Sequence, residues 1–205
     1  MIARSNPPAL DASLLRRELQ RTYAKIALFP RRRYHLNTGR ALAELVGYDP
    51  IELASLPAPA VDAYCGAGNP VAIAEPRPGE AVLDVGCGAG LDLQLAARRV
   101  GPTGRAVGID STPEMVQTAR LAAKAARARN VRVEVGQAER LPFADASFDV
   151  VLSNNVVNNC CVDKLAVLRE VHRVLRPGGR LAVADVMIRR PIPDGGRAEI
   201  GLWTC

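Results

Sequence analysis

Several features that would assign this chain to a common class are missing from its sequence. The 205 residues contain no uncharged run of eighteen apolar residues, which excludes a transmembrane helix. The first twenty residues show no long apolar run followed by a small-residue cleavage site, so we expect no secretory signal. The five cysteines are odd in number and include no CxxC pair. We therefore expect free thiols in a reducing cytoplasm, in a chain whose 48% apolar content can form a sizeable core.

Acidic residues are scarce in only one part of the chain. Residues 1–40 hold nine Lys/Arg and two Asp/Glu, whereas the other 165 residues hold 18 and 19, so the formal charge of +6 belongs to the N-terminal segment. A basic segment can bind nucleic acid or a membrane surface. No nucleic-acid motif or interleaved aromatic residues accompany it. We therefore expect a solvated helix face, with no nucleic-acid partner and no membrane partner.

The first third of the chain is predicted to be a helical cap, assigned to residues 1–75. Apolar residues recur at helical spacing over 10–28, and a second short helix is expected over 39–47. A further helical turn is expected to be broken by Pro57 and Pro59.

From residue 76 onward, short apolar runs alternate with helical patterns. This alternation predicts an α/β fold, a doubly wound parallel sheet with helices on both faces. On the last expected helix, Leu165, Leu168, Val171 and Leu175 are predicted to form the buried face. The predicted strands are 81–86, 105–110, 131–137, 147–154 and 180–188, and the predicted helices are 91–101, 112–130 and 162–179.

A glycine-rich loop follows the first predicted strand and precedes a helix. It reads Asp84-Val-Gly86-Cys-Gly88-Ala-Gly90, and glycine allows a ligand to approach the backbone closely. The next strand ends at Asp110, where a carboxylate can accept hydrogen bonds from both ribose hydroxyls. These features predict an adenosine-containing ligand at the carboxyl edge of the sheet.

Two ligand classes fit such a loop. A dinucleotide site favours GxGxxG, but here Leu91 stands where the third glycine of that pattern falls. The carboxylate of Asp84 suits the ammonium group of an amino acid and would repel a pyrophosphate. S-adenosylmethionine carries an ammonium group and a ribose without phosphate, so it is favoured over a nicotinamide cofactor of an oxidoreductase.

The motifs VLDVGCGAG, AVGIDST, GQAERLPFADASFDVVLSN and EVHRVLRPGGRLAVADV, in this order, resemble those of class I S-adenosylmethionine-dependent methyltransferases, which have a Rossmann-like fold. The resemblance assigns residues 76–205 to the methyltransferase domain, and Gln137 stands where the family often has an acid. It implies contacts to the methionine part, the ribose, the adenine and the underside of the cofactor. The corresponding residues are Asp84, Gly86 and Gly88 for methionine, Asp110 for ribose, Ser111, Gln137 and Ala138 for adenine, and Asn154 beneath the cofactor.

The segments GYDPIELASLP, GNP, LSNNVVNN and PIPDGGRAEIGLWTC are similar to arsenite methyltransferases, which hold trivalent arsenic with cysteine thiolates. Two positions where that family commonly has cysteine are Asn155 and Ala67 here, while Cys205 matches a third. Cys160 and Cys161 lie five to six residues beyond the first of these positions. The resemblance implies Cys160, Cys161 and Cys205 as candidate catalytic residues acting on a small-molecule acceptor, for which arsenite is the sharpest expectation. No metal cofactor site is indicated.

The chain stops soon after the fifth predicted strand. Class I methyltransferases usually continue with a helix and an antiparallel strand pair, so this pair is expected to be missing, by truncation or otherwise. An exposed sheet edge would favour a homo-oligomer. A protein that binds the cofactor without catalysis stays open as an alternative. Of the two histidines, His172 is expected at the surface, and His35 is a candidate for the acceptor side.

Overall fold

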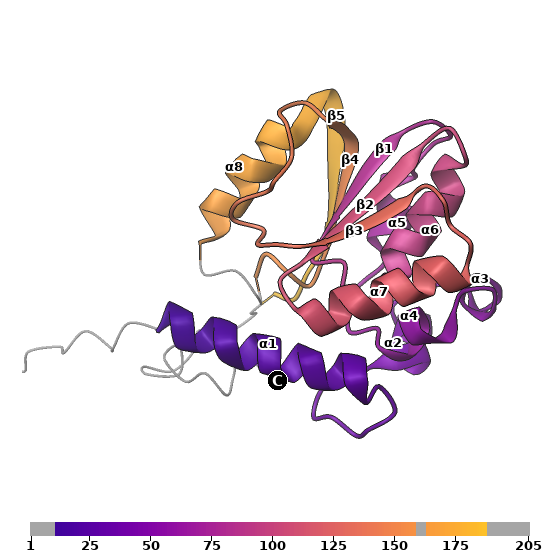
Figure 1. The fold of residues 1–205 in the computed structure, drawn as a ribbon, viewed down its shortest axis with the longest axis vertical. Coiled ribbons are helices and arrows are strands. Elements are labelled where there is room, and N and C mark those ends of the chain that lie inside the picture. Colours follow the sequence, from indigo (N-terminus) through magenta and orange to yellow (C-terminus); the bar gives the residue numbers. More distant parts are fainter. Residues whose placement is uncertain (1–10, 159–162, 188–205) are drawn as a thin grey trace, which may run out of the picture.

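The computed structural model describes residues 11–158 and 163–187, and these form one parallel sheet with helices on both faces (Figure 1). The five strands are ordered β3-β2-β1-β4-β5. Their bounds are β1 Ala81–Val85, β2 Arg105–Asp110, β3 Val131–Val135, β4 Phe148–Asn154 and β5 Leu175–Ala184. This architecture confirms the predicted fold class.

Strand β1 lies at the centre of the sheet, and all five of its residues are buried. Val85 pairs with Ile109 of β2 on one side and with Ser153 of β4 on the other. The carboxyl ends of these three parallel strands therefore meet at one edge. Because the strand order reverses between β1 and β4, this edge contains the crevice in which doubly wound folds bind their ligands.

Two apolar layers cover the sheet. Helices α5 (Pro70–Ala74), α6 (Leu91–Val100) and α7 (Pro113–Ala125) pack on one face, where Val82, Leu93 and Val150 are fully buried. Helix α8 (Lys164–Val174) covers the other face. Figure 1 shows α8 on the opposite side of the sheet from α5, α6 and α7.

The N-terminal helices lie beside the layer that contains α7. Helix α1 (Ala12–Leu28) begins at Asp11, whose carboxylate accepts from the Ser13 and Leu14 amides at 2.9 and 3.0 Å. It runs along α7, as Figure 1 shows. The shorter helices are α2 (Gly39–Leu45), α3 (Pro50–Ala54) and α4 (Ala58–Asp62).

The proline-rich segment differs from its prediction. Pro57 and Pro59 do end the helical turn of α3, but they also begin α4, because proline is well suited to the first turn of a helix. Helix α5 has no counterpart in the predicted elements. Asn69 caps it by accepting from the Ala72 amide at 3.0 Å, and Pro70 occupies its first position.

The predicted buried face of the last helix is confirmed for Val171 and wrong for the leucines. Leu165 and Leu168 are exposed, and the buried residues are Val167, Val171 and Val174. The helix ends at Val174 rather than 179, because Leu175 already pairs with Phe148 as part of β5. Because Leu175 belongs to β5 and not to α8, the buried side of α8 is formed by Val167, Val171 and Val174. Helix α7 also ends earlier than predicted, at Ala125, two residues before Arg127 adopts a left-handed conformation with a φ of 52°.

Candidate functional site

The glycine loop after β1 is held against the end of β2 by backbone hydrogen bonds. The amides of Gly86 and Cys87 both donate to the Ile109 carbonyl, at 2.7 and 3.0 Å. Gly86 has a φ of 72°, and a Cβ at this position would overlap the Val156 side chain. The loop therefore needs glycine for both its conformation and its packing. Cys87 in this loop is buried.

Asp110 connects the loop to the end of β2. One of its carboxylate oxygens accepts from the Gly88 amide at 2.9 Å and the other from the Thr112 amide at 2.8 Å. Burial raises the pKa of this carboxyl, while the two amides lower it. The side chain lines a cavity at the edge of the sheet, and a carboxylate can accept further hydrogen bonds beyond these two.

Asp84 lies beneath the loop and does not line this cavity. It is 1% exposed, and its Oδ2 atom has no hydrogen-bond partner among the residues that the structure describes. Burial, followed by the charges of Asp92 and Asp110, raises its pKa well above the ordinary value. Its predicted direct contact with a ligand ammonium group stays a prediction.

Asp92, which the sequence analysis did not select, lines the cavity from the first turn of α6. Its Oδ1 atom accepts from the Tyr48 hydroxyl at 2.5 Å, and its Oδ2 atom accepts from the side-chain amide (Nδ2) of Asn154 at 2.9 Å. Burial raises the pKa of Asp92 to about 6, although these two hydrogen bonds lower it. The group is therefore ionised at neutral pH, and its charge helps to raise the pKa of Tyr48.

Asn154 joins the end of β4 to the segment before α5. Its Oδ1 atom accepts from the Ala67 amide at 2.7 Å and from the Gly68 amide at 3.3 Å. The Tyr64 hydroxyl donates to the Gly68 carbonyl at 2.8 Å. A Cβ on Gly66 would overlap both Tyr64 and Asn154, so glycine allows this close approach. Asn154 also lines the cavity, and its predicted place beneath a cofactor stays a prediction.

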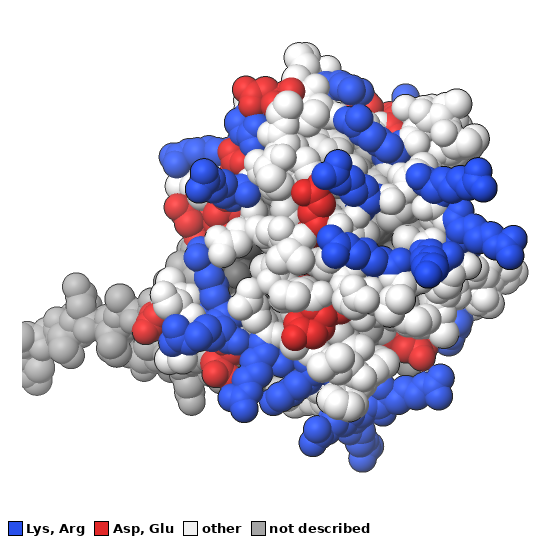
Figure 2. Space-filling view, in the orientation of Figure 1, with Lys and Arg blue, Asp and Glu red and all other residues white. Residues whose placement is uncertain are grey.

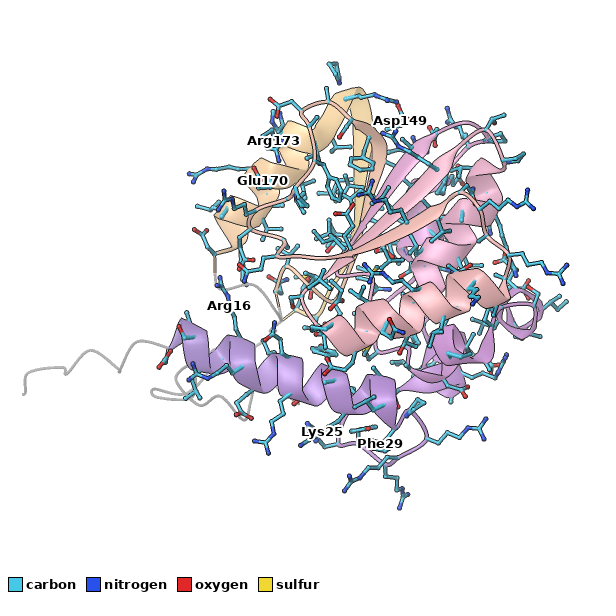
Figure 3. The ribbon with its side chains drawn as sticks, in the orientation of Figure 1. Arg16, Lys25, Phe29, Asp149, Glu170 and Arg173 are labelled. Atoms are coloured by element: carbon cyan, nitrogen blue, oxygen red, sulfur yellow. The ribbon has the colours of Figure 1, made fainter. Side chains whose placement is uncertain are left out.

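Helix α1 contributes one wall of the cavity. Gln20 donates to the Ser111 carbonyl at 2.8 Å, and Arg16 forms a 2.8 Å ion pair with Glu139 in the loop after β3. Figure 3 shows Arg16 on the side of α1 that faces the sheet. Both contacts reach the region predicted to bind adenine.

The structure brings most of the predicted cofactor residues to one cavity. Its lining includes the predicted residues Gly86, Gly88, Asp110, Ser111, Gln137, Ala138 and Asn154. The residues that sequence reasoning missed are Asp92, Tyr64 and the α1 side chains Arg16, Leu19, Gln20 and Tyr23. An acid two residues after a glycine loop was the available signal for Asp92.

A second cavity adjoins the first and shares Leu19, Tyr23, Cys65, Gly66 and Asn155 with it. We call it the acceptor-side cavity. Its other described lining residues are mostly apolar. They are Thr22, Leu36, Asn37, Leu42, Val46, Ala67, Asp185 and Val186.

The candidate cysteines Cys160, Cys161 and Cys205 lie outside the described residues. Within the described part of the chain, Cys65 is the cysteine that lines the acceptor-side cavity, and burial raises its pKa to about 12. His172 is exposed on α8, and His35 lines neither cavity. Across residues 11–158 and 163–187, no group of three His, Cys, Asp or Glu side chains is arranged to hold a metal. No helix in these ranges has the length and apolar character to cross a bilayer.

Comparison with known proteins gives a consistent pattern. A family model described as a methyltransferase domain matches residues 76–200. The chain is 47% identical over 152 residues to an arsenite methyltransferase of Halobacterium salinarum, a match that covers 74% of this chain and 38% of that protein. It is 39% identical over 80 residues to the ubiquinone/menaquinone biosynthesis C-methyltransferase UbiE of a Geobacter species, covering 38% of this chain and 34% of that protein.

A solved structure shows the same arrangement. CrArsM, an arsenic(III) S-adenosylmethionine methyltransferase from Chlamydomonas reinhardtii, matches with a TM-score of 0.61 and 34% identity, covering 81% of this chain and 55% of that one. The chain spans less than half the length of either curated relative.

Proposed function

The chain belongs to the class I S-adenosylmethionine-dependent methyltransferases, whose cofactor is S-adenosylmethionine, and we propose that it transfers the methyl group of this cofactor to a small molecule. The sulfonium of the bound cofactor supplies an already activated methyl group. The remaining task of the protein is to hold the acceptor in line with that group and to exclude water.

The observation that carries this proposal is the placement of two carboxylates in one cavity on either side of the glycine loop. In this proposal the Asp110 carboxylate, which lines the cavity, accepts hydrogen bonds from the two hydroxyls of a ribose. Asp92 offers a negative charge to an ammonium group. Gly86 and Gly88 have no side chains, so a ligand can approach the loop backbone closely at these two positions. The residues present therefore fit an amino-acid nucleoside.

We assign the contact with the ammonium group to Asp92 rather than to Asp84. Both carboxylates are buried, but Asp92 lines the cavity and Asp84 does not. Tyr48 and Asn154 fix the Asp92 carboxylate from two directions, which orients it before a ligand arrives. In this proposal Asp84 lies below the loop and does not touch the ligand.

Calorimetry with S-adenosylhomocysteine tests this assignment. We expect Asp92→Asn to weaken binding about tenfold to a hundredfold, because a hydrogen bond to a charged group contributes about 1.5–3 kcal/mol. Asp145→Asn is the matched control, since Asp145 is exposed and lies outside the cavity lining. Unchanged affinity in Asp92→Asn would remove Asp92 from the site.

We propose that the acceptor occupies the acceptor-side cavity, and two acceptor classes can be tested there. Relatedness to an arsenite methyltransferase supports arsenite, whose lone pair needs no general base. The apolar lining by Leu36, Leu42 and Val46 supports an organic acceptor. The raised pKa of Cys65 keeps this thiol protonated at neutral pH, so thiolate ligands for arsenic would have to come from Cys160, Cys161 or Cys205.

Labelled methyl transfer distinguishes the two classes. Arsenite and an alkyl-substituted hydroquinone are incubated in parallel with the protein and labelled S-adenosylmethionine. If arsenite is the acceptor, Cys161→Ser or Cys205→Ser lowers its methylation while S-adenosylhomocysteine affinity stays unchanged. Unchanged rates in both variants would reject the thiolate model, and methylation of the hydroquinone alone would support the organic acceptor.

A further inference from the structure

The C-terminal end of α1 presents two adjacent apolar side chains to solvent. Leu28 is 61% exposed and Phe29 is 58% exposed. Figure 3 shows Lys25 and Phe29 at this end of α1, on the outer boundary of the molecule and far from Arg16. Neither Leu28 nor Phe29 lines the cofactor cavity or the acceptor-side cavity, so the proposed methyl transfer does not explain their exposure.

This apolar pair is held in place by hydrogen bonds. The Tyr34 hydroxyl lies 2.7 Å from the Lys25 carbonyl and 3.0 Å from the Phe29 carbonyl. The Arg32 amide donates to the Phe29 carbonyl at 3.0 Å, which closes a turn immediately after the helix. The chain thus folds back under the pair and keeps it facing outward.

Positive charge surrounds the pair. Lys25, Arg31, Arg32 and Arg33 are all exposed, and together with Leu28 and Phe29 we call them the basic tip. Arg31 has an ion-pair partner, Asp62, at 3.5 Å, but the Arg31 side chain is 88% exposed. Such an exposed pair neutralises little of the local charge.

The charge continues along the outer face of α1. Arg17 and Arg21 are exposed and precede Lys25 at intervals of four residues, so the three side chains share one side of the helix. Figure 2 shows basic side chains along the lower boundary of the molecule, over α1 and the loop after it. Much of the excess charge in the described part of the N-terminal segment therefore lies on the outer face of α1 and the loop after it.

We propose that the basic tip docks onto the surface of an anionic lipid bilayer. Leu28 and Phe29 would enter the boundary between headgroups and acyl chains, and the surrounding cations would contact the anionic headgroups. This proposal departs from the sequence-based expectation of no membrane partner. The adjacency of exposed apolar and basic residues, which the fold fixes, is the reason.

A bilayer fits this surface better than a nucleic acid does. Proteins that bind single strands use a positively charged groove along which the backbone can run. The basic tip is instead an outward corner at the end of a helix, with aliphatic and aromatic carbon at its apex. Such a corner can penetrate a lipid surface. The open hollow at the tip is lined by four consecutive residues, Phe29 to Arg32, and does not form a groove along which a strand could run.

Docking would also bring the acceptor-side cavity close to lipid. Leu36 and Asn37, which line that cavity, come shortly after the tip in the sequence. Leu19 and Tyr23, on the inner side of α1, line it as well. An acceptor dissolved in the bilayer would therefore have a short path to the cavity.

Co-sedimentation of the full chain with vesicles tests the proposal. Vesicles of pure phosphatidylcholine are compared with vesicles that contain phosphatidylglycerol as about a third of the lipid, at low and at moderate salt. We expect at least about tenfold stronger binding to the anionic vesicles, weakened by salt. Equal binding to both compositions, or no binding to either, would overturn the proposal.

Paired variants identify the surface responsible. Leu28→Ser/Phe29→Ser and Arg31→Ser/Arg32→Ser/Arg33→Ser should each lower binding about tenfold or more. The control is Leu45→Ser/Ile51→Ser, which removes side chains that are 76% and 80% exposed on α2 and α3. Equal losses in control and tip variants would contradict the assignment.

Two further measurements complete the test. Unchanged S-adenosylhomocysteine affinity shows that each variant is folded, and a variant that loses it is replaced by the corresponding single substitution. A short DNA duplex is added as a competitor at fixed salt. The lipid proposal fails if the chain binds the duplex tightly but does not bind the vesicles. If the Leu28→Ser/Phe29→Ser variant then binds the duplex as well as the wild type does, the surface is a nucleic-acid site.

Discussion

Two regions of the molecule are held in place by different kinds of contact. One is the carboxyl edge of the sheet that forms the cofactor cavity, and the other is the helical segment from α1 to α5, which we call the cover. At the edge, the amides of Gly86, Cys87 and Gly88 are fixed by a carbonyl or a carboxylate of β2. The cover is attached largely through side chains, such as Gln20 on the Ser111 carbonyl and Arg16 on Glu139. We infer that the edge tolerates few substitutions, whereas the cover can vary in sequence without loss of the fold.

The largest expected effect comes from a side chain in the glycine loop. Gly86→Ala places a Cβ at a φ of 72° and against Val156, so we expect the free energy of unfolding to fall by about 2–4 kcal/mol. Cofactor binding should weaken with it, because the loop backbone has to move. Chemical denaturation and calorimetry measure the two quantities.

A matched control for this substitution exists in the cover. Gly47 also has a positive φ, 95°, but a Cβ there would meet no atom within 4 Å. We expect Gly47→Ala to cost only about 1 kcal/mol and to leave cofactor affinity unchanged. Equal effects of the two substitutions would show that the edge is no more constrained than the cover.

The same contrast separates what sequence could predict from what it could not. The loop at 84–90, Asp110 and the alternation of strands with helices follow from local patterns, since each signal lies within a few consecutive residues. Asp92 could not be recognised in this way, because its partners Tyr48 and Asn154 are 44 and 62 residues away in the chain. A lone acid in the first turn of a helix is equally well explained by the helix dipole.

The errors on α8 have a comparable origin. Leu165, Leu168, Val171 and Leu175 give a helical apolar stripe, so periodicity alone favoured the three leucines over Val167 and Val174. Pairing of Leu175 with Phe148 ends the helix at Val174, and this contact joins two strands that are distant in the sequence. Tertiary pairing therefore decided both the boundary and the buried face.

An intermediate effect is expected from pH. The pKa of Asp92 in the free protein is raised to about 6, so its carboxyl becomes neutral as the pH falls through that value. A ligand ammonium group favours the ionised form, and S-adenosylhomocysteine should therefore bind about tenfold more weakly at pH 5 than at pH 7. Asp92→Asn should remove most of this dependence. A wild-type affinity that is constant between pH 5 and 7 would contradict the role of Asp92.

The smallest expected effect is that of the ion pair between Arg16 and Glu139. Their side chains are 40% and 15% exposed, so a double-mutant cycle to alanine should give a coupling of about 0.5–1 kcal/mol in unfolding. Arg99 and Glu52 form a comparable pair at 2.7 Å outside the cofactor cavity and should give a similar coupling. Of these two pairs, only Arg16 and Glu139 connect α1 to the loop after β3 across the cofactor cavity. Removal of this pair alone should therefore speed the dissociation of S-adenosylhomocysteine, by about two- to threefold. No measurable coupling between Arg16 and Glu139, or identical dissociation rates in both cycles, would show that this ion pair does not hold α1 against the loop after β3.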